Sequence, residues 1–160
     1  MRVNLDNANQ LLDRLELLEG KIESLRQTII RLAVSSLPNP EYPYWYMIVA
    51  LGISEEKKAD LEFVLFMLTD RLSGTKIIVN QNDDVTDEMF TSEDRIITLS
   101  KASRFPDTLV RNAPPEWEES ISIVSSVLEI PYEETVKRIL LAMREQGMFE
   151  QLINYLFNEN

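Results

Sequence analysis

The chain has 160 residues, carries 27 acidic against 16 basic side chains, and has a formal net charge of −11. It contains neither cysteine nor histidine, which excludes disulfides, zinc sites of the usual kinds, cysteine nucleophiles and imidazole acid–base chemistry. With 44% hydrophobic residues but only 4 glycines and 7 prolines, the composition predicts one folded and mainly helical protein.

Hydropathy and charge indicate where in the cell the protein is expected and which classes of partner are excluded. The longest strongly apolar run, residues 44–51, is far shorter than the roughly 20 residues that span a bilayer. The N-terminus is charged where a signal peptide would be apolar, so we expect a cytoplasmic protein without a membrane segment. A negative surface without a Lys/Arg stripe repels phosphate, so we expect no direct binding of DNA or RNA.

The acidic side chains form no motif that points to catalysis. They are scattered along predicted helices and are not paired as in carboxylate-dependent enzymes. Asn80, Asn82 and Asp84 have the one-three-five spacing of a calcium loop, but Val85 and Thr91 stand where that loop needs glycine and glutamate. We therefore expect no enzymatic activity, no metal site and no cofactor.

The first predicted element is a helix within residues 1–37 that carries a heptad repeat. Apolar residues recur from Ala8 at alternating steps of three and four, which is the spacing of a coiled-coil seam. With Ala8 at heptad position a, the following a and d positions are Leu11, Leu15, Leu18, Ile22, Leu25, Ile29 and Leu32. Isoleucine at a with leucine at d favours a parallel pair, so these residues are predicted to form a homo-oligomer, a dimer or larger.

The residues that flank the seam leave a second interpretation open. In a parallel pair Arg14 at g attracts Glu19 at e of the second helix, whereas Lys21 at g repels Arg26 at e. Further apolar residues widen the surface beyond a strict seam, namely Leu12, Leu17, Ile30 and Val34. An amphipathic helix packed on its own domain is therefore the alternative.

Prolines between residues 38 and 43 end this helix and separate it from a second unit, residues 38–160. Helices are predicted over residues 43–50 and from a Ser54 N-cap to about Leu72. Residues 75–113 hold no period for long, apart from possible extended stretches at 75–79 and 96–99 and a brief helix from Asp87. They are predicted to be an irregular, partly ordered insertion that orders on a partner.

Regular helix returns after Pro114-Pro115. Apolar residues keep helical spacing from Trp117 to Leu128, from Val136 to Met143 and over residues 148–157, which should close the core. The predicted fold class is all-α (mainly), with a long N-terminal heptad helix followed by a compact helical bundle that carries the irregular insertion.

Two groups of surface residues are candidates for contact with a partner protein. Tyr42 and Trp45 belong to an aromatic cluster beside the prolines, a composition typical of interaction hot spots, although aromatic residues at helical spacing also pack in cores. Glu116, Glu118 and Glu119 begin an acidic cluster that suits a basic surface. Carboxylates are also favoured at helix N-termini for purely structural reasons.

Four short stretches carry a resemblance to a known family: residues 42–46 (YPYWY), 51–56 (LGISEE), 134–135 (ET) and 145–152 (EQGMFEQL). In them the chain resembles the YhaI-like family of small uncharacterised bacterial proteins, over about residues 10–74 and 115–157. The resemblance implies a compact all-helical fold without known enzymatic activity and brings no catalytic residues. The longer heptad helix and residues 75–113 depart from the family pattern.

These patterns lead to three hypotheses of function. The first is a non-enzymatic regulatory or adaptor protein that oligomerises through its N-terminal helix and binds a partner protein through its acidic body. The second is a small acidic inhibitor, of the kind that phages encode, that imitates nucleic acid or blocks a host protein. The third is an enzyme that uses carboxylates and a divalent metal.

Overall fold

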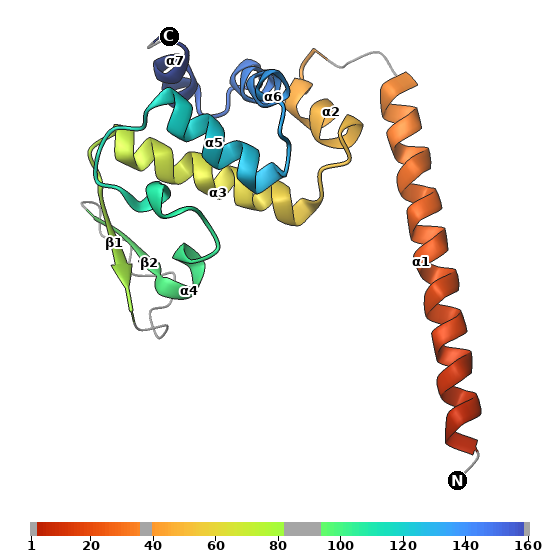
Figure 1. Ribbon diagram of the computed structural model, residues 1–160. Helices are drawn as coiled ribbons and strands as arrows, with labels where there is room; N and C mark the ends of the chain where they lie inside the picture. The colour runs from red at the N-terminus through yellow and green to blue at the C-terminus, as the bar shows by residue number, and fades with distance from the viewer. Residues whose placement is uncertain (1–2, 36–39, 82–93, 159–160) are drawn as a thin grey trace.

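A computed structural model describes residues 3–35, 40–81 and 94–158 of the chain. The structure is mainly helical and includes a small two-stranded sheet, which confirms the predicted class with its long N-terminal helix (Figure 1). The helices are α1 (Val3–Ser35), α2 (Pro43–Ala50), α3 (Glu55–Leu72), α4 (Leu99–Ala102), the 3-10 helix η1 (Asp107–Val110), α5 (Trp117–Leu128), α6 (Glu133–Glu145) and α7 (Glu150–Asn158). The strands are β1 (Lys76–Asn80) and β2 (Asp94–Thr98).

Helix α1 is one uninterrupted helix of 33 residues, about 50 Å long at 1.5 Å per residue. It stands beside the rest of the molecule, which we call the body (residues 40–81 and 94–158). Helix α2 lies next to the C-terminal half of α1, and the N-terminal half extends away from the body (Figure 1). The predicted boundary between residues 37 and 38 lies outside the described residues.

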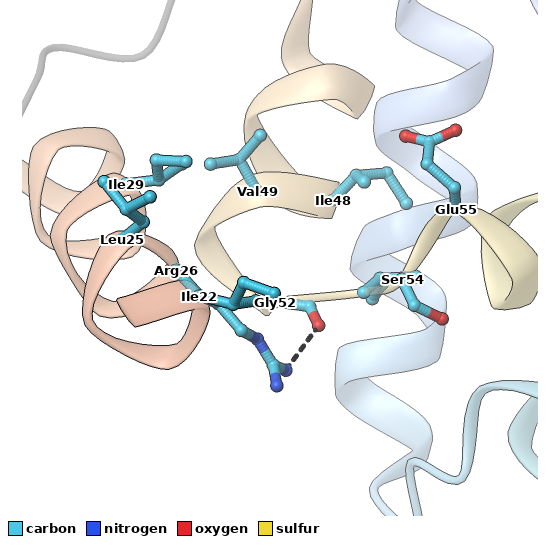
Figure 2. Close-up of a pocket in the computed structure, with 10 residues that line it drawn as sticks. Ile22, Leu25, Arg26, Ile29, Ile48, Val49, Gly52, Ser54 and Glu55 are labelled. Atoms are coloured by element: carbon cyan, nitrogen blue, oxygen red, sulfur yellow. Dashed lines mark hydrogen bonds between the residues drawn. The ribbon is translucent and has the colours of Figure 1, made fainter. Parts of the chain in front are cut away.

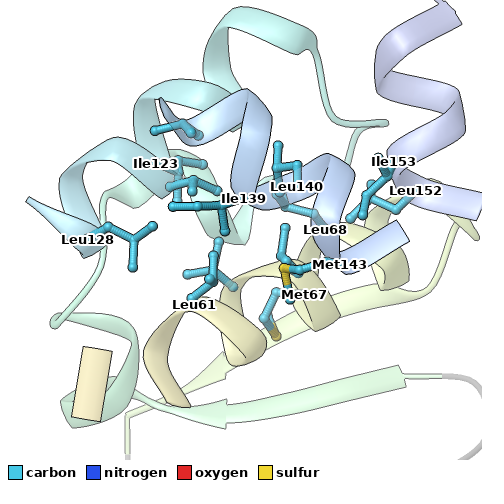
Figure 3. Packing of buried hydrophobic residues seen from close by; sticks show 14 of the residues in the cluster. Leu61, Met67, Leu68, Ile123, Leu128, Ile139, Leu140, Met143, Leu152 and Ile153 are labelled. Carbon is cyan, nitrogen blue, oxygen red and sulfur yellow. The ribbon is translucent and has the colours of Figure 1, made fainter. Parts of the chain in front are cut away.

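Helix α3 is the centre of the body. The Ser54 side chain caps it by accepting a hydrogen bond from the Lys57 backbone N–H, and Gly74 follows its end with a φ of +78°. Its buried face packs against α5 and α7, and α6 packs on both of these helices. Figure 3 shows Leu61 and Leu68 of α3 facing buried side chains of the three C-terminal helices, which close the core as expected.

The region of residues 75–113 is more regular, where it is described, than the sequence predicted. The two extended stretches are confirmed as β1 and β2, which pair in parallel with Ile77 opposite Arg95. Ile77, Ile97, Phe105 and Leu109 are buried in the core of the body. These parts are therefore better ordered than the sequence predicted, because the pairing of β1 with β2 and the burial of their side chains depend on residues far apart in the chain. The predicted helix from Asp87 and most of the rejected calcium loop lie outside the described residues.

Candidate interaction surface

The seven seam residues of α1 form an exposed apolar stripe, which we call the α1 stripe: Leu11, Leu15, Leu18, Ile22, Leu25, Ile29 and Leu32. Each of them has between 52% and 64% of its surface exposed. Scattered exposed leucines are normal on a protein surface, but a contiguous apolar patch marks a site of interaction. The body of the same chain therefore does not bury this stripe.

Helix α1 is nevertheless attached to the body on one flank of the stripe. The Arg26 Nη2 atom donates a hydrogen bond of 3.0 Å to the Gly52 carbonyl oxygen, just after the end of α2. Gly52 has a φ of +64°, and a Cβ atom on it would come within 3.2 Å of side-chain atoms of both Arg26 and Ile30. Glycine is thus needed at this position for its backbone conformation and for the close approach of α1.

An open groove with a volume of about 540 Å³ lies between α1 and α2 (Figure 2). One wall is part of the α1 stripe, namely Ile22, Leu25 and Ile29. The other wall is apolar as well and includes Ile48 and Val49 of α2. Charged groups from Arg26 and Glu55 border this surface, so the groove has an apolar floor and a polar rim. This arrangement is typical of protein interfaces.

The body holds α2, and with it the second wall of the groove, in a fixed position. The Tyr44 side chain is fully buried, and its hydroxyl donates a hydrogen bond of 3.2 Å to the Glu62 Oε1 atom on α3. Burial, and then the nearby Glu62 carboxylate, raise the pKa of the Tyr44 hydroxyl far above its ordinary value. The Gln146 Oε1 atom accepts hydrogen bonds from the backbone N–H groups of Tyr44 and Trp45, at 3.1 Å and 3.4 Å. It thereby satisfies donors at the N-terminus of α2.

The two aromatic candidates lie at the N-terminal end of α2, Tyr42 as its N-cap residue and Trp45 in its first turn. Tyr42 is 50% exposed and Trp45 is 44% exposed. The Trp45 ring also contacts the Lys58 ammonium group at 4.8 Å from its centre, which fixes the orientation of the indole. Both side chains can therefore contact another molecule without leaving the positions they hold in the body.

The structure separates the three acidic candidates. Glu116 and Glu118 are exposed, but the Glu119 side chain is 11% exposed and its Oε2 atom lies 3.0 Å from Nη2 of the buried Arg71. Glu119 thus joins α5 to α3 and is a structural residue, which corrects its grouping with the other two. Its position four residues before the buried Ile123 places it on the inner side of α5, a signal that the sequence contained.

Several residues of this surface escaped the sequence analysis. The sequence patterns place Arg26 at a flanking position of the coil and give Gly52 and Arg71 no functional role. Among the described residues, no group of three or more acidic side chains is placed to hold a metal ion. No described helix is long and apolar enough to cross a membrane.

Comparison with family models, with curated proteins and with solved structures gives no match to this chain. The resemblance to the YhaI-like family accordingly stays a prediction that rests on four short stretches.

Proposed function

We propose that this protein is a non-enzymatic, cytoplasmic adaptor or regulatory protein that self-associates through the α1 stripe and presents its body to a partner protein. The observation that carries the proposal is the exposure of every residue of the stripe, each by more than half of its surface. An amphipathic helix that packed on its own domain would have its apolar side covered, which is the arrangement of α5, α6 and α7.

Burial of the stripe supplies the driving force for self-association. Covering the exposed half of a leucine or isoleucine side chain is worth about 1 kcal/mol. A dimer buries two copies of the stripe. The gross free energy gained by this burial is therefore of the same order as the cost of association, about 4–15 kcal/mol. The heptad spacing lets the two stripes interdigitate as knobs into holes, which adds close packing to the area that is buried.

Light scattering on the full chain tests the self-association. We expect the wild-type protein to have the mass of a dimer or a larger assembly, and the double variant Leu18→Asp with Leu25→Asp to be a monomer. The control variant Gln10→Asp with Ser24→Asp adds the same two charges at heptad position c, on the exposed polar side of α1. It should stay assembled. A wild-type monomer at tens of micromolar would overturn the proposal.

The partner-binding part of the proposal rests on the exposed aromatic residues Tyr42 and Trp45 at the start of α2. Exposed tyrosine and tryptophan side chains are the residue types that most often dominate binding energy. Replacing Tyr42 and Trp45 together by alanine should abolish capture of the partner protein while the mass of the assembly stays unchanged. Unchanged capture would exclude this surface.

The acidic inhibitor is the second candidate, and one observation favours it. Glu118 and Glu133 line a common groove between α5 and α6. Lys137 lies in that groove with its Nζ atom 2.9 Å from Glu133 Oε1, and this contact lowers the pKa of Glu133 and partly neutralises the site. For an inhibitor, Glu116→Gln with Glu118→Gln and higher salt should weaken capture. For an adaptor with an aromatic contact, both should have little effect.

A further inference from the structure

We infer, on the basis of the self-association proposed above, that the groove between α1 and α2 receives α1 of a second copy of this chain, and that the two α1 helices run parallel. The groove and the stripe are one continuous surface, because Ile22, Leu25 and Ile29 belong to both. A helix that lies on this part of the stripe must also meet the opposite wall, which Val49 of α2 lines (Figure 2). The body is therefore part of the interface between the two copies.

The position of the body on α1 favours the parallel arrangement. Arg26 at heptad position e and Ile30 at position b contact Gly52, and both lie on the same flank of the stripe. The symmetry axis of a parallel pair runs along the helices, so the e flanks, and with them the two bodies, point to opposite sides. In an antiparallel pair the e flanks face the same side.

An antiparallel pair also brings the two bodies together along the helix. The stripe extends from Leu11 to Leu32, so full overlap of two stripes places the midpoint of an antiparallel pair close to Ile22. The body is attached beside this midpoint, near Arg26. Two bodies attached there on the same side compete for one space. The parallel pair avoids this conflict and still covers the whole stripe.

The structure also reduces the charge conflict that the sequence predicted between Lys21 and Arg26 of a parallel pair. The Arg26 Nη2 atom is directed to the Gly52 carbonyl oxygen, and its Nη1 atom lies 3.8 Å from Glu23 Oε2. Lys21 of the second copy, at position g, faces the e flank that bears the groove. The exposed carboxylate of Glu55 lines the same groove and lies 3.4 Å from Lys58 Nζ; in the parallel pair it would accept Lys21 of the second copy as a further partner.

Cysteine cross-linking tests the orientation, and the chain has no cysteine of its own. In a parallel pair the two thiols of Leu11→Cys, at position d, face each other and should form a disulfide under mild oxidation. Asp13→Cys at the outer position f is the matched control and should form little. Antiparallel helices would separate the two Leu11→Cys thiols by roughly 30 Å. They would instead give a cross-link in a mixture of Leu11→Cys and Ile29→Cys chains, because d packs against a in an antiparallel pair, and this would overturn the parallel arrangement.

A charge exchange tests whether the body takes part in the interface. Lys21→Glu and Glu55→Lys should each raise the dissociation constant of the pair by up to about fivefold, and the double variant should restore it. Glu56→Lys, next to Glu55 but outside the groove, is the control and should have a smaller effect on dissociation that Lys21→Glu does not reverse. Suppose that the protein assembles, that Val49→Lys leaves its dissociation constant unchanged, and that the Lys21→Glu and Glu55→Lys effects are simply additive. The inference that α1 of a second copy occupies the groove would then be refuted. The proposed self-association would then still stand.

Discussion

The α1 helix and the body both carry leucines at helical spacing, but these leucines are exposed in α1 and buried in the body. Leu61 and Leu68 of α3 are completely buried among the C-terminal helices (Figure 3). Leu11 and Leu18 of α1 have the same helical spacing and remain more than half exposed. Periodicity thus shows that one side of a helix is apolar but does not show whether the chain itself, or another molecule, covers that side.

Ion pairs differ between the two regions in the same way. In the body, Arg71 and Glu119 are nearly excluded from water, whereas Arg26 and Glu23 of α1 pair on the open surface. A buried charge that loses its partner is costly, and an exposed pair contributes little. Substitutions of buried residues in the body should therefore affect unfolding, and substitutions in the α1 stripe should affect the proposed self-association. Both tryptophans, Trp45 and Trp117, are in the body, so their fluorescence follows the unfolding of that region alone.

The largest expected effect comes from one leucine-to-alanine change in each region. Leu65→Ala leaves a cavity in the core and should destabilise the body by about 4 kcal/mol. The transition followed by tryptophan fluorescence should then fall by roughly 10 °C. Leu15→Ala should leave this transition within about 2 °C of wild type and weaken self-association. A similar loss for both variants would mean that the body, after all, buries the α1 stripe.

The next largest effect concerns the two environments of neighbouring acids on α5. Glu119→Ala leaves the buried Arg71 guanidinium without its counter-charge and should destabilise the body by about 3 kcal/mol. Glu118→Ala removes an exposed carboxylate and should change stability by less than about 0.5 kcal/mol. Urea denaturation of both variants compares them directly. Equal midpoints would show that Glu119 has no structural role.

Alkaline pH should test the packing of α2 through Tyr44. Below pH 10 the tyrosine is protonated in the folded and the unfolded chain; above it the unfolded chain releases the proton that the folded chain keeps. Stability is therefore complete below pH 10 and should fall by about 1.4 kcal/mol per pH unit above it because of this group. Between pH 10 and 11, where the unfolded tyrosine passes from half to mostly ionised, the loss of stability in urea denaturation should be smaller for Tyr44→Phe than for wild type by about 1 kcal/mol. Identical slopes would contradict the burial of the hydroxyl.

The smallest effect is a gain in stability within the body. The Ser120 Oγ atom is buried in α5 and has no hydrogen-bond partner in the described part of the chain. Ser120→Ala removes this unpaired group and improves helix propensity, so the melting temperature should rise by roughly 3 °C, or about 1 kcal/mol. Ser122→Ala on the exposed side of α5 measures the propensity alone and should raise it less. A loss of stability at Ser120 would point to a hydrogen bond with water.

Local sequence rules accounted for much of the fold. The heptad spacing predicted α1, and the helix expected from a Ser54 N-cap to about Leu72 matches α3 to within about two residues. The β-branched stretches predicted both strands. These features depend on residues within a few positions of each other, so a single sequence contains the information that determines them.

The remaining features depend on residues that are far apart in the chain. The local acidic cluster does not distinguish Glu119 from the exposed Glu118. The difference comes from Arg71, 48 residues away, which pairs with Glu119 in the folded chain. The groove exists because Arg26 reaches Gly52, and the order in residues 94–113 comes from parallel pairing with β1 and packing on α3. The sequence by itself determined which helix sides are apolar and where helices begin and end, because backbone and neighbouring side chains set these locally. Only the tertiary structure decided which apolar sides the chain buries and which it leaves exposed, because burial depends on contacts between distant segments.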